Sequence, residues 1–137
     1  MQDPGKEESV FLASFPKPDP QFISKETENR WNDILKIREM VFAKLEEAKN
    51  AGVINKPIEA RITLHLDKSK MDILPKDATE LAGYFIVSQV ELAEGDEACF
   101  VEKATGEKCQ RCWLILKETG CDEKHPGLCP RCAKALE

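Results

Sequence analysis

Long apolar runs are missing from this 137-residue sequence. No stretch approaches the roughly 20 apolar residues that a membrane-spanning helix needs, and Met1–Glu8 lacks the basic start and apolar run of a signal peptide. Internal repeats and low-complexity tracts are missing too. We therefore expect a soluble protein of the cytoplasm with no membrane partner.

Combinations of catalytic residues are missing as well. The sequence supplies no nucleophile, acid and carboxylate at a recognisable spacing, so we expect no catalytic activity in this chain. His65 is one of only two histidines, and it falls with Arg61 on the polar side of an alternating segment. We expect both side chains to face solvent, which is the default for a half-exposed strand.

A long amphipathic helix is predicted over residues 24–51. Ser24 is suited to cap its first turn, and Gly52 follows where a left-handed residue ends many helices. Arg38 interrupts the apolar stripe, and we expect its side chain to reach solvent along that surface, with a buried glutamate pair or an RNA contact as alternatives. The residues expected to form the buried stripe are Trp31, Ile34, Leu35, Val41, Phe42, Leu45 and Ala48.

Three strands are predicted after this helix. Residues 58–66 alternate between apolar and polar side chains, which is typical of a half-buried strand. Residues 84–92 are rich in aromatic and β-branched side chains and predict a second strand, and residues 97–102 predict a third. Pro75 can open a short helix over residues 76–83 between the first two strands.

These elements predict an α+β fold class, with a long helix packed on a small antiparallel or mixed sheet and a small four-cysteine module after it. We expect an extended lead-in over residues 1–22, because its prolines disfavour helix. An α+β unit should follow over residues 23–103. Residues 104–137 should form the last module, whose own apolar content is too low for it to fold unaided.

Four of the six cysteines form two Cys-x-x-Cys pairs, Cys109 with Cys112 and Cys129 with Cys132. The pairs are sixteen residues apart, which matches the spacing of four-cysteine zinc sites. A closed shell of four sulfurs leaves no position for water, so the sequence predicts one structural Zn²⁺ ion. Disulfides and a redox site are the alternatives, but cytosolic thiols are kept reduced and a redox pair normally occurs once, in a thioredoxin-like setting.

The other cysteines and one histidine fit this pattern less well. Cys121 and His125 lie between the two pairs and could replace one ligand or form a second weak site, although neither keeps the paired spacing. Cys99 is expected to be a small buried hydrophobe in a strand.

The charge of the chain limits how it could bind nucleic acid. The net charge is −5, and 20 Lys and Arg residues face 25 Asp and Glu residues. Residues 103–137 carry seven basic and five acidic residues, but four thiolates on Zn²⁺ would cancel this local excess. Any nucleic-acid binding must therefore come from the placement of basic groups.

The two cysteine pairs lie in the segments Lys108–Trp113 (KCQRCW) and His125–Cys132 (HPGLCPRC). Together these segments resemble the C-terminal zinc-binding end of bacterial-type isoleucyl-tRNA synthetase. The similarity covers most of residues 9–136, because weaker matches occur upstream at Ser9–Leu12, in the Trp31–Lys49 helix with Ile37 and Arg38, at Ile58–Ala60 and at Phe85–Ser88.

The resemblance implies a fragment of a class I ligase that joins isoleucine to its tRNA using ATP. Its expected partners are the anticodon arm of that tRNA and the rest of the parent synthetase, and no DNA partner is expected. The family's His-x-Gly-His signature does not occur here, so ATP would serve only in the parent enzyme. The zinc module would help to dock the anticodon arm.

Four residues beside the cysteines are candidates for RNA binding: Lys108, Arg111, Trp113 and Arg131. Zinc would hold their backbones rigid, and an aromatic ring next to guanidinium groups suits stacking and phosphate contact with an unpaired RNA loop. The alternative is that Trp113 caps the small core of the module and the arginines are solvated.

Two other functions remain open at this point. One is the zinc-finger tail of a DNA-repair glycosylase, although such an enzyme needs an N-terminal proline nucleophile that Met1-Gln2 does not provide. The other is a zinc-dependent protein-interaction module that packs on its own parent enzyme.

Overall fold

The longest element is α1 (Lys25–Asn50), seen in a computed structural model that describes residues 7–15 and 17–136. The Oγ of Ser24 accepts a hydrogen bond from the backbone N–H of Thr27 at 3.2 Å, which satisfies one free donor of the first turn. Gly52 follows the helix with φ +75°. The predicted helix and its cap are confirmed.

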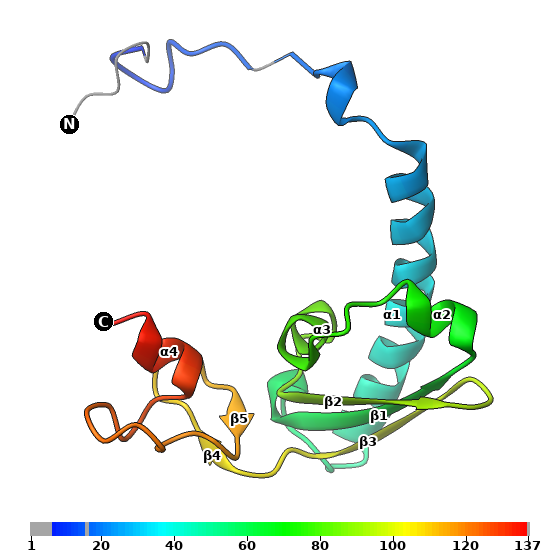
Figure 1. The fold of residues 1–137 in the computed structure, drawn as a ribbon, viewed down its shortest axis with the longest axis vertical. Helices are drawn as coiled ribbons and strands as arrows, with labels where there is room; N and C mark the ends of the chain where they lie inside the picture. The colour runs from blue at the N-terminus through cyan, green and yellow to red at the C-terminus, as the bar shows by residue number, and fades with distance from the viewer. Residues whose placement is uncertain (1–6, 16, 137) are drawn as a thin grey trace.

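One side of α1 is buried, but its first turns are not. The residues with helical spacing that lie in the core are Ile34, Ile37, Val41, Leu45 and Ala48. Trp31 and Leu35, expected in the core from the sequence, are 43% and 44% exposed. The first turns of α1 extend past the sheet (Figure 1), so the ring of Tyr84, 5.2 Å from that of Trp31, covers the indole only in part. The prediction of a core position for Trp31 is wrong.

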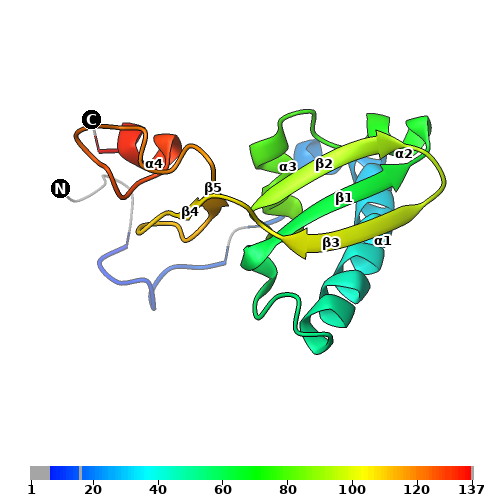
Figure 2. The ribbon, with the colours of Figure 1, turned by 90° about the horizontal axis from the view of Figure 1, so that it is seen from below.

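The sheet has three strands in the order β2-β1-β3. Its central strand β1 (Ala60–Leu66) pairs parallel with β2 (Gln89–Glu94) and antiparallel with β3 (Ala98–Lys103), so the sheet is mixed. Alternate residues of β1 are fully buried, namely Ala60, Ile62, Leu64 and Leu66. Figure 2 shows α1 and α3 behind the sheet and its other face uncovered. The predicted α+β class is confirmed.

The uncovered face of the sheet carries polar side chains. Arg61 forms ion pairs across both neighbouring strands, with Glu91 at 2.7 Å and with Glu102 at 3.9 Å. His65 packs its ring against the edge of Phe100, with the centroids 5.4 Å apart. Arg61 and His65 therefore lie on the outer face, as the alternation predicts.

The second strand begins later than the sequence predicts. Asp77 caps α3 (Ala78–Phe85) by accepting a hydrogen bond from the N–H of Glu80 at 2.8 Å, so Tyr84 and Phe85 end a helix. Phe85 is fully buried on that helix. Ile86 then reverses the chain with φ +58°, and β2 starts at Gln89. Burial of Phe85 outweighs the strand preference of its neighbours, since such propensities are weak against tertiary packing.

Arg38 joins α1 to the end of α3. Its Nε donates to the carbonyl of Tyr84 at 3.0 Å, and its guanidinium lies 4.4 Å from the centre of the Phe42 ring. A cation is favourable at the C-terminal end of a helix, where free carbonyls gather. Arg38 is half-buried along the apolar surface, as expected, and the structure adds the hydrogen bond that anchors its guanidinium on α3.

The described part of the lead-in, residues 7–15 and 17–22, extends away from the rest of the chain (Figure 1). Among these described residues there is one short 3-10 helix, Pro20–Phe22. The apolar side chains of this part are largely exposed, with 94% of Phe11 and 98% of Phe15 accessible. Within the described ranges, no helix combines the length and the apolarity that crossing a membrane requires.

Short elements form the rest of the chain. α2 (Lys68–Asp72) connects β1 to α3. After β3 come β4 (Glu107–Lys108) and β5 (Ile115–Leu116), which pair antiparallel, and then α4 (Pro130–Lys134). The four paired cysteines lie on the turn between β4 and β5 and at the start of α4.

Leu64→Ala should lower the free energy of unfolding by about 2–5 kcal/mol, because it opens a cavity under the middle of the sheet. Chemical denaturation followed by far-UV circular dichroism measures this loss. Thr63→Ala, on the outer face of the same strand, is the matched control and should cost less than about 1 kcal/mol. Equal losses from both substitutions would contradict the assignment of the two faces.

Candidate metal centre

The first cysteine pair lies on the tight turn between β4 and β5. The N–H of Cys109 donates to the carbonyl of Leu114 at 2.9 Å, and the N–H of Trp113 donates to the carbonyl of Cys109 at 2.9 Å. Trp113 adopts φ +67°, a left-handed conformation that is uncommon outside glycine. This turn folds the chain back so that Cys109 and Cys112 approach the same point.

The second pair lies at the start of α4. Cys129 precedes the helix, and Pro130 fixes the backbone of its first residue. The N–H of Cys132 donates to the carbonyl of Cys129 at 2.9 Å, which closes the first turn. The two sulfurs are thereby presented from one end of a short helix.

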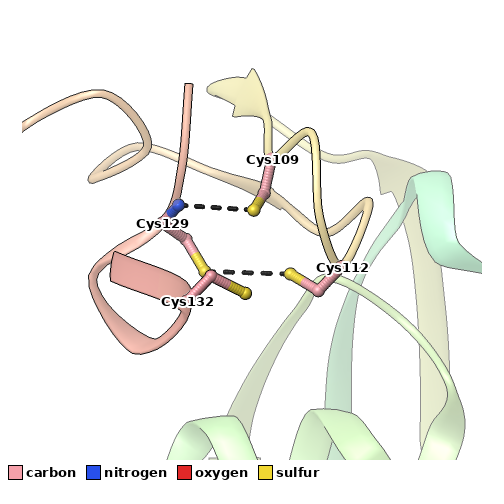
Figure 3. Close-up of side chains that lie close together, drawn as sticks. All are labelled: Cys109, Cys112, Cys129 and Cys132. Carbon is pink, nitrogen blue, oxygen red and sulfur yellow. Dashed lines mark hydrogen bonds between the residues drawn. The ribbon is translucent and has the colours of Figure 1, made fainter. Parts of the chain in front are cut away.

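All four sulfurs converge (Figure 3), each lying within 4.8 Å of the others. The Sγ atoms of Cys112 and Cys129 are 3.7 Å apart. A tetrahedral zinc ion with bonds of about 2.3 Å requires sulfurs roughly 3.8 Å apart, so the donor set fits that ion. Cys109 and Cys129 are fully buried and Cys132 nearly so. The cluster is suited to one structural Zn²⁺ ion, and the cofactor prediction is confirmed.

The protonation of these thiols depends strongly on their surroundings. Burial opposes ionisation of Cys109, but the backbone N–H groups of Cys112, Cys129 and Arg111 outweigh it and lower its pKa to about 6. Burial raises the pKa of Cys129 to about 12. Because zinc binds thiolates, the cation itself must supply the charge that keeps the buried Cys129 deprotonated.

The two cysteine pairs are tied together through the backbone. The N–H of Gln110 donates to the carbonyl of Gly127 at 3.0 Å, and the N–H of Cys129 donates to the Sγ of Cys109 at 3.3 Å. A Cβ atom on Gly127 would lie 2.6 Å from the side chain of Gln110. A larger residue at this position would therefore require the flexible side chain of Gln110 to move.

The remaining candidates for metal binding lie outside the cluster. Cys121 is exposed, and the Nδ1 of His125 is 3.3 Å from a carboxylate oxygen of Asp122. Cys99 is buried in β3, as predicted, and burial raises the pKa of its thiol to about 11. Among the described residues, the four paired cysteines form the one metal-ligand cluster.

The four candidates for RNA binding lie at the surface around the cluster. Trp113 is 60% exposed, and the Nζ of Lys108 lies 5.6 Å from the centre of its ring. The guanidinium of Arg111 donates to the carbonyl of Cys132 at 3.3 Å. Arg131, also exposed, lies at the edge of a cleft of about 650 Å³ between the module and the α+β unit.

The apolar core of the module does not use its tryptophan. Leu116 and Leu128 pack against the buried cysteines, together with the half-buried Cys112. The four sulfurs thus form most of this core, which explains why so few apolar side chains are needed.

Comparison with known proteins places the module in a defined class. Residues 106–135 match a family described as the zinc finger found in FPG and IleRS. The match covers both cysteine pairs.

The whole chain is similar to a segment of isoleucine–tRNA ligases. It is 37% identical to that of Petrotoga mobilis over 141 residues, which cover 96% of this chain and 15% of the relative. It is 40% identical to that of Aquifex aeolicus, with coverage of 98% and 15%, and 40% identical to that of Shouchella clausii, with coverage of 95% and 15%. The chain therefore spans about 15% of the length of these relatives.

These relatives confirm the resemblance that the sequence indicates. The zinc-finger family includes both FPG and IleRS, so the finger alone does not separate a ligase from other proteins. The ligases, however, match the α+β unit as well as the finger. The alternative of a DNA-repair glycosylase tail is therefore not favoured.

Two residues that connect the module to the sheet were not predicted from the sequence. Ser88 is buried and Gln89 half-buried at the start of β2. Their side chains form hydrogen bonds with the segment that enters the zinc module. Their position could have indicated this role, because a serine and a glutamine inside an otherwise apolar predicted strand are polar groups that need hydrogen-bond partners when buried.

Cys132→Ser should abolish stoichiometric zinc binding and unfold residues 104–136, because structural zinc contributes on the order of 10–16 kcal/mol to such modules. Metal analysis measures the zinc content, and amide NMR signals show which residues remain folded. The signals of β1 to β3 should persist.

Cys121→Ser is the matched control for this substitution. It removes an exposed thiol from the same module, and the variant should keep one zinc ion per chain. An ordered, metal-free module in the Cys132→Ser variant would contradict the assigned role of the cluster.

Proposed function

We propose that the chain is the C-terminal tRNA-binding part of an isoleucine–tRNA ligase, in which the zinc module helps to dock the anticodon arm. The parent enzyme would attach isoleucine to its tRNA with ATP in the cytoplasm, and this part would contribute placement without catalysing the reaction. The observation that carries the proposal is the exposed ring of Trp113, held on the turn that contains two zinc ligands.

Trp113 has the properties of a platform for an unpaired base. It follows Cys112 directly, and its backbone is fixed by the hydrogen bond to Cys109, so little conformational freedom would be lost on binding. Its ring is 60% exposed, and apolar burial within the module is supplied by other residues. Stacking on such a ring accepts any base, because every base has a π face.

The basic side chains near Trp113 suit the phosphates on either side of a stacked base. Lys108 lies within cation–π distance of the ring, and Arg111 uses one N–H group on Cys132 while its guanidinium remains exposed. Phosphate contacts of this kind fix register and orientation without reading sequence. Because the chain as a whole carries a net charge of −5, RNA binding would depend on the placement of these few basic groups and not on overall charge.

The lead-in supports the fragment interpretation. Phe11 and Phe15 are almost entirely exposed, and large apolar side chains usually find a partner surface. In the parent enzyme that surface would belong to the part of the ligase that precedes this chain. The division into residues 1–22, 23–103 and 104–137 is part of the same proposal.

Trp113→Ala should weaken binding to the anticodon stem-loop of isoleucine tRNA by roughly 5- to 150-fold, which is the effect of losing about 1–3 kcal/mol of stacking. Fluorescence anisotropy with the zinc-loaded chain measures the dissociation constant. The wild-type affinity should fall as salt rises, and a DNA duplex should bind more weakly than the RNA.

Trp31→Ala is the matched control, since it removes the chain's other tryptophan from α1 and is expected to leave RNA affinity unchanged. Zinc content is measured for each variant. If Trp113→Ala retained both its zinc and the wild-type RNA affinity, the proposed role of Trp113 would fail. A wild-type chain that bound neither nucleic acid would instead favour a protein-interaction module.

A further inference from the structure

The apolar cores of the two units are separate. The core of the α+β unit is formed by α1, α3 and the three strands, and the core of the zinc module by its cysteines with Leu116 and Leu128. No residue among those described belongs to both. Apolar burial therefore stabilises each unit but does not set the angle between them.

Hydrogen bonds from two adjacent side chains connect the units instead. The Nε2 of Gln89 donates to the carbonyl of Thr105 at 2.6 Å and to the carbonyl of Ile115 at 3.1 Å, and its Oε1 accepts from the N–H of Thr105 at 3.4 Å. The Oγ of Ser88 accepts from the N–H of Ile115 at 2.8 Å. We name this set the polar clamp.

The polar clamp holds both parts of the module that leave the sheet. Thr105 lies in the link between β3 and β4, and Ile115 begins β5 on the hairpin that carries Cys109 and Cys112. One further hydrogen bond ties the start of the link to the α+β unit, from the N–H of Ala104 to the carbonyl of Glu59 at 2.7 Å. In the described part of the chain, every hydrogen bond between residues up to Lys103 and residues 105–136 involves Ser88 or Gln89.

The clamp residues are themselves firmly placed. Val87 is buried in the core beside them, and the backbone N–H of Ser88 donates to the carbonyl of Ala60 at 3.1 Å. The Oγ of Ser88 also donates to the carbonyl of Ile58 at 2.5 Å, so this hydroxyl bridges the sheet and the module. A buried hydroxyl with both a donor and an acceptor partner has a defined orientation.

We infer that Ser88 and Gln89 are positioning residues that set the orientation of the zinc module relative to the sheet. They fix the cleft between the two units, whose walls include Gln89 on one side and Arg131 on the other. Resting on the proposed function, this inference means that the clamp presents Trp113 and Arg131 to the RNA in one arrangement.

The test compares residual dipolar couplings of backbone amides in the zinc-loaded 137-residue chain. In the wild type, couplings from β1 to β3 and from the zinc module should fit one alignment tensor. Gln89→Met keeps the length of the side chain but removes its three hydrogen bonds, and Ser88→Ala removes the fourth. The double variant should lose the common tensor while retaining its zinc and the amide shifts of each unit's core.

Glu94→Gln, an exposed position at the far end of β2, is the matched control and should keep the wild-type tensor. Gln89→Met alone leaves the buried Ser88 intact and should lose the common tensor even if the double variant fails to fold. A wild-type tensor in Gln89→Met would overturn the inference. The RNA titration is scored separately: absence of binding by the wild type would reject the proposed function, while the tensors would still decide the role of the clamp.

Discussion

Four sulfur atoms that converge on one point determine the shape of the last thirty residues. The two turns that carry them contain little regular structure, and their backbones are connected mainly through Cys109, Gln110 and Gly127. Zinc replaces the apolar core that so short a segment lacks. The cysteines serve both as metal ligands and as the core of the module. The ring of Trp113 is not part of this core and is exposed at the surface.

The two units of the chain are stabilised by different physical terms. The α+β unit depends on apolar burial between α1, α3 and one face of a mixed sheet, while the module depends on metal coordination. Between them the structure uses hydrogen bonds, which are directional and therefore define an angle better than apolar contact does. Because the two cores are separate, we expect the module to fold, or to unfold on losing its metal, while the α+β core stays folded.

Much of this organisation could be predicted from local patterns. Helical spacing and a serine cap located α1 almost to the residue, strict alternation located β1, and the Cys-x-x-Cys spacing located the metal site. The start of β2 could not be predicted in this way, because Tyr84 and Phe85 favour strands locally but are placed in α3 by the burial of Phe85. The exposure of Trp31 was not predicted, because helical spacing shows which side of a helix is apolar but not how far along the helix the sheet covers that side.

The sequence by itself determined the class of the fold, the metal and its ligands, since periodicity and ligand spacing act over short distances along the chain. Only the tertiary structure decided which strand lies in the centre, that Arg38 connects two helices, and that Ser88 and Gln89 hold the zinc module. These features join residues that lie far apart in the sequence. The pairing of a buried polar group with a distant backbone atom depends on the finished packing, which no local pattern records.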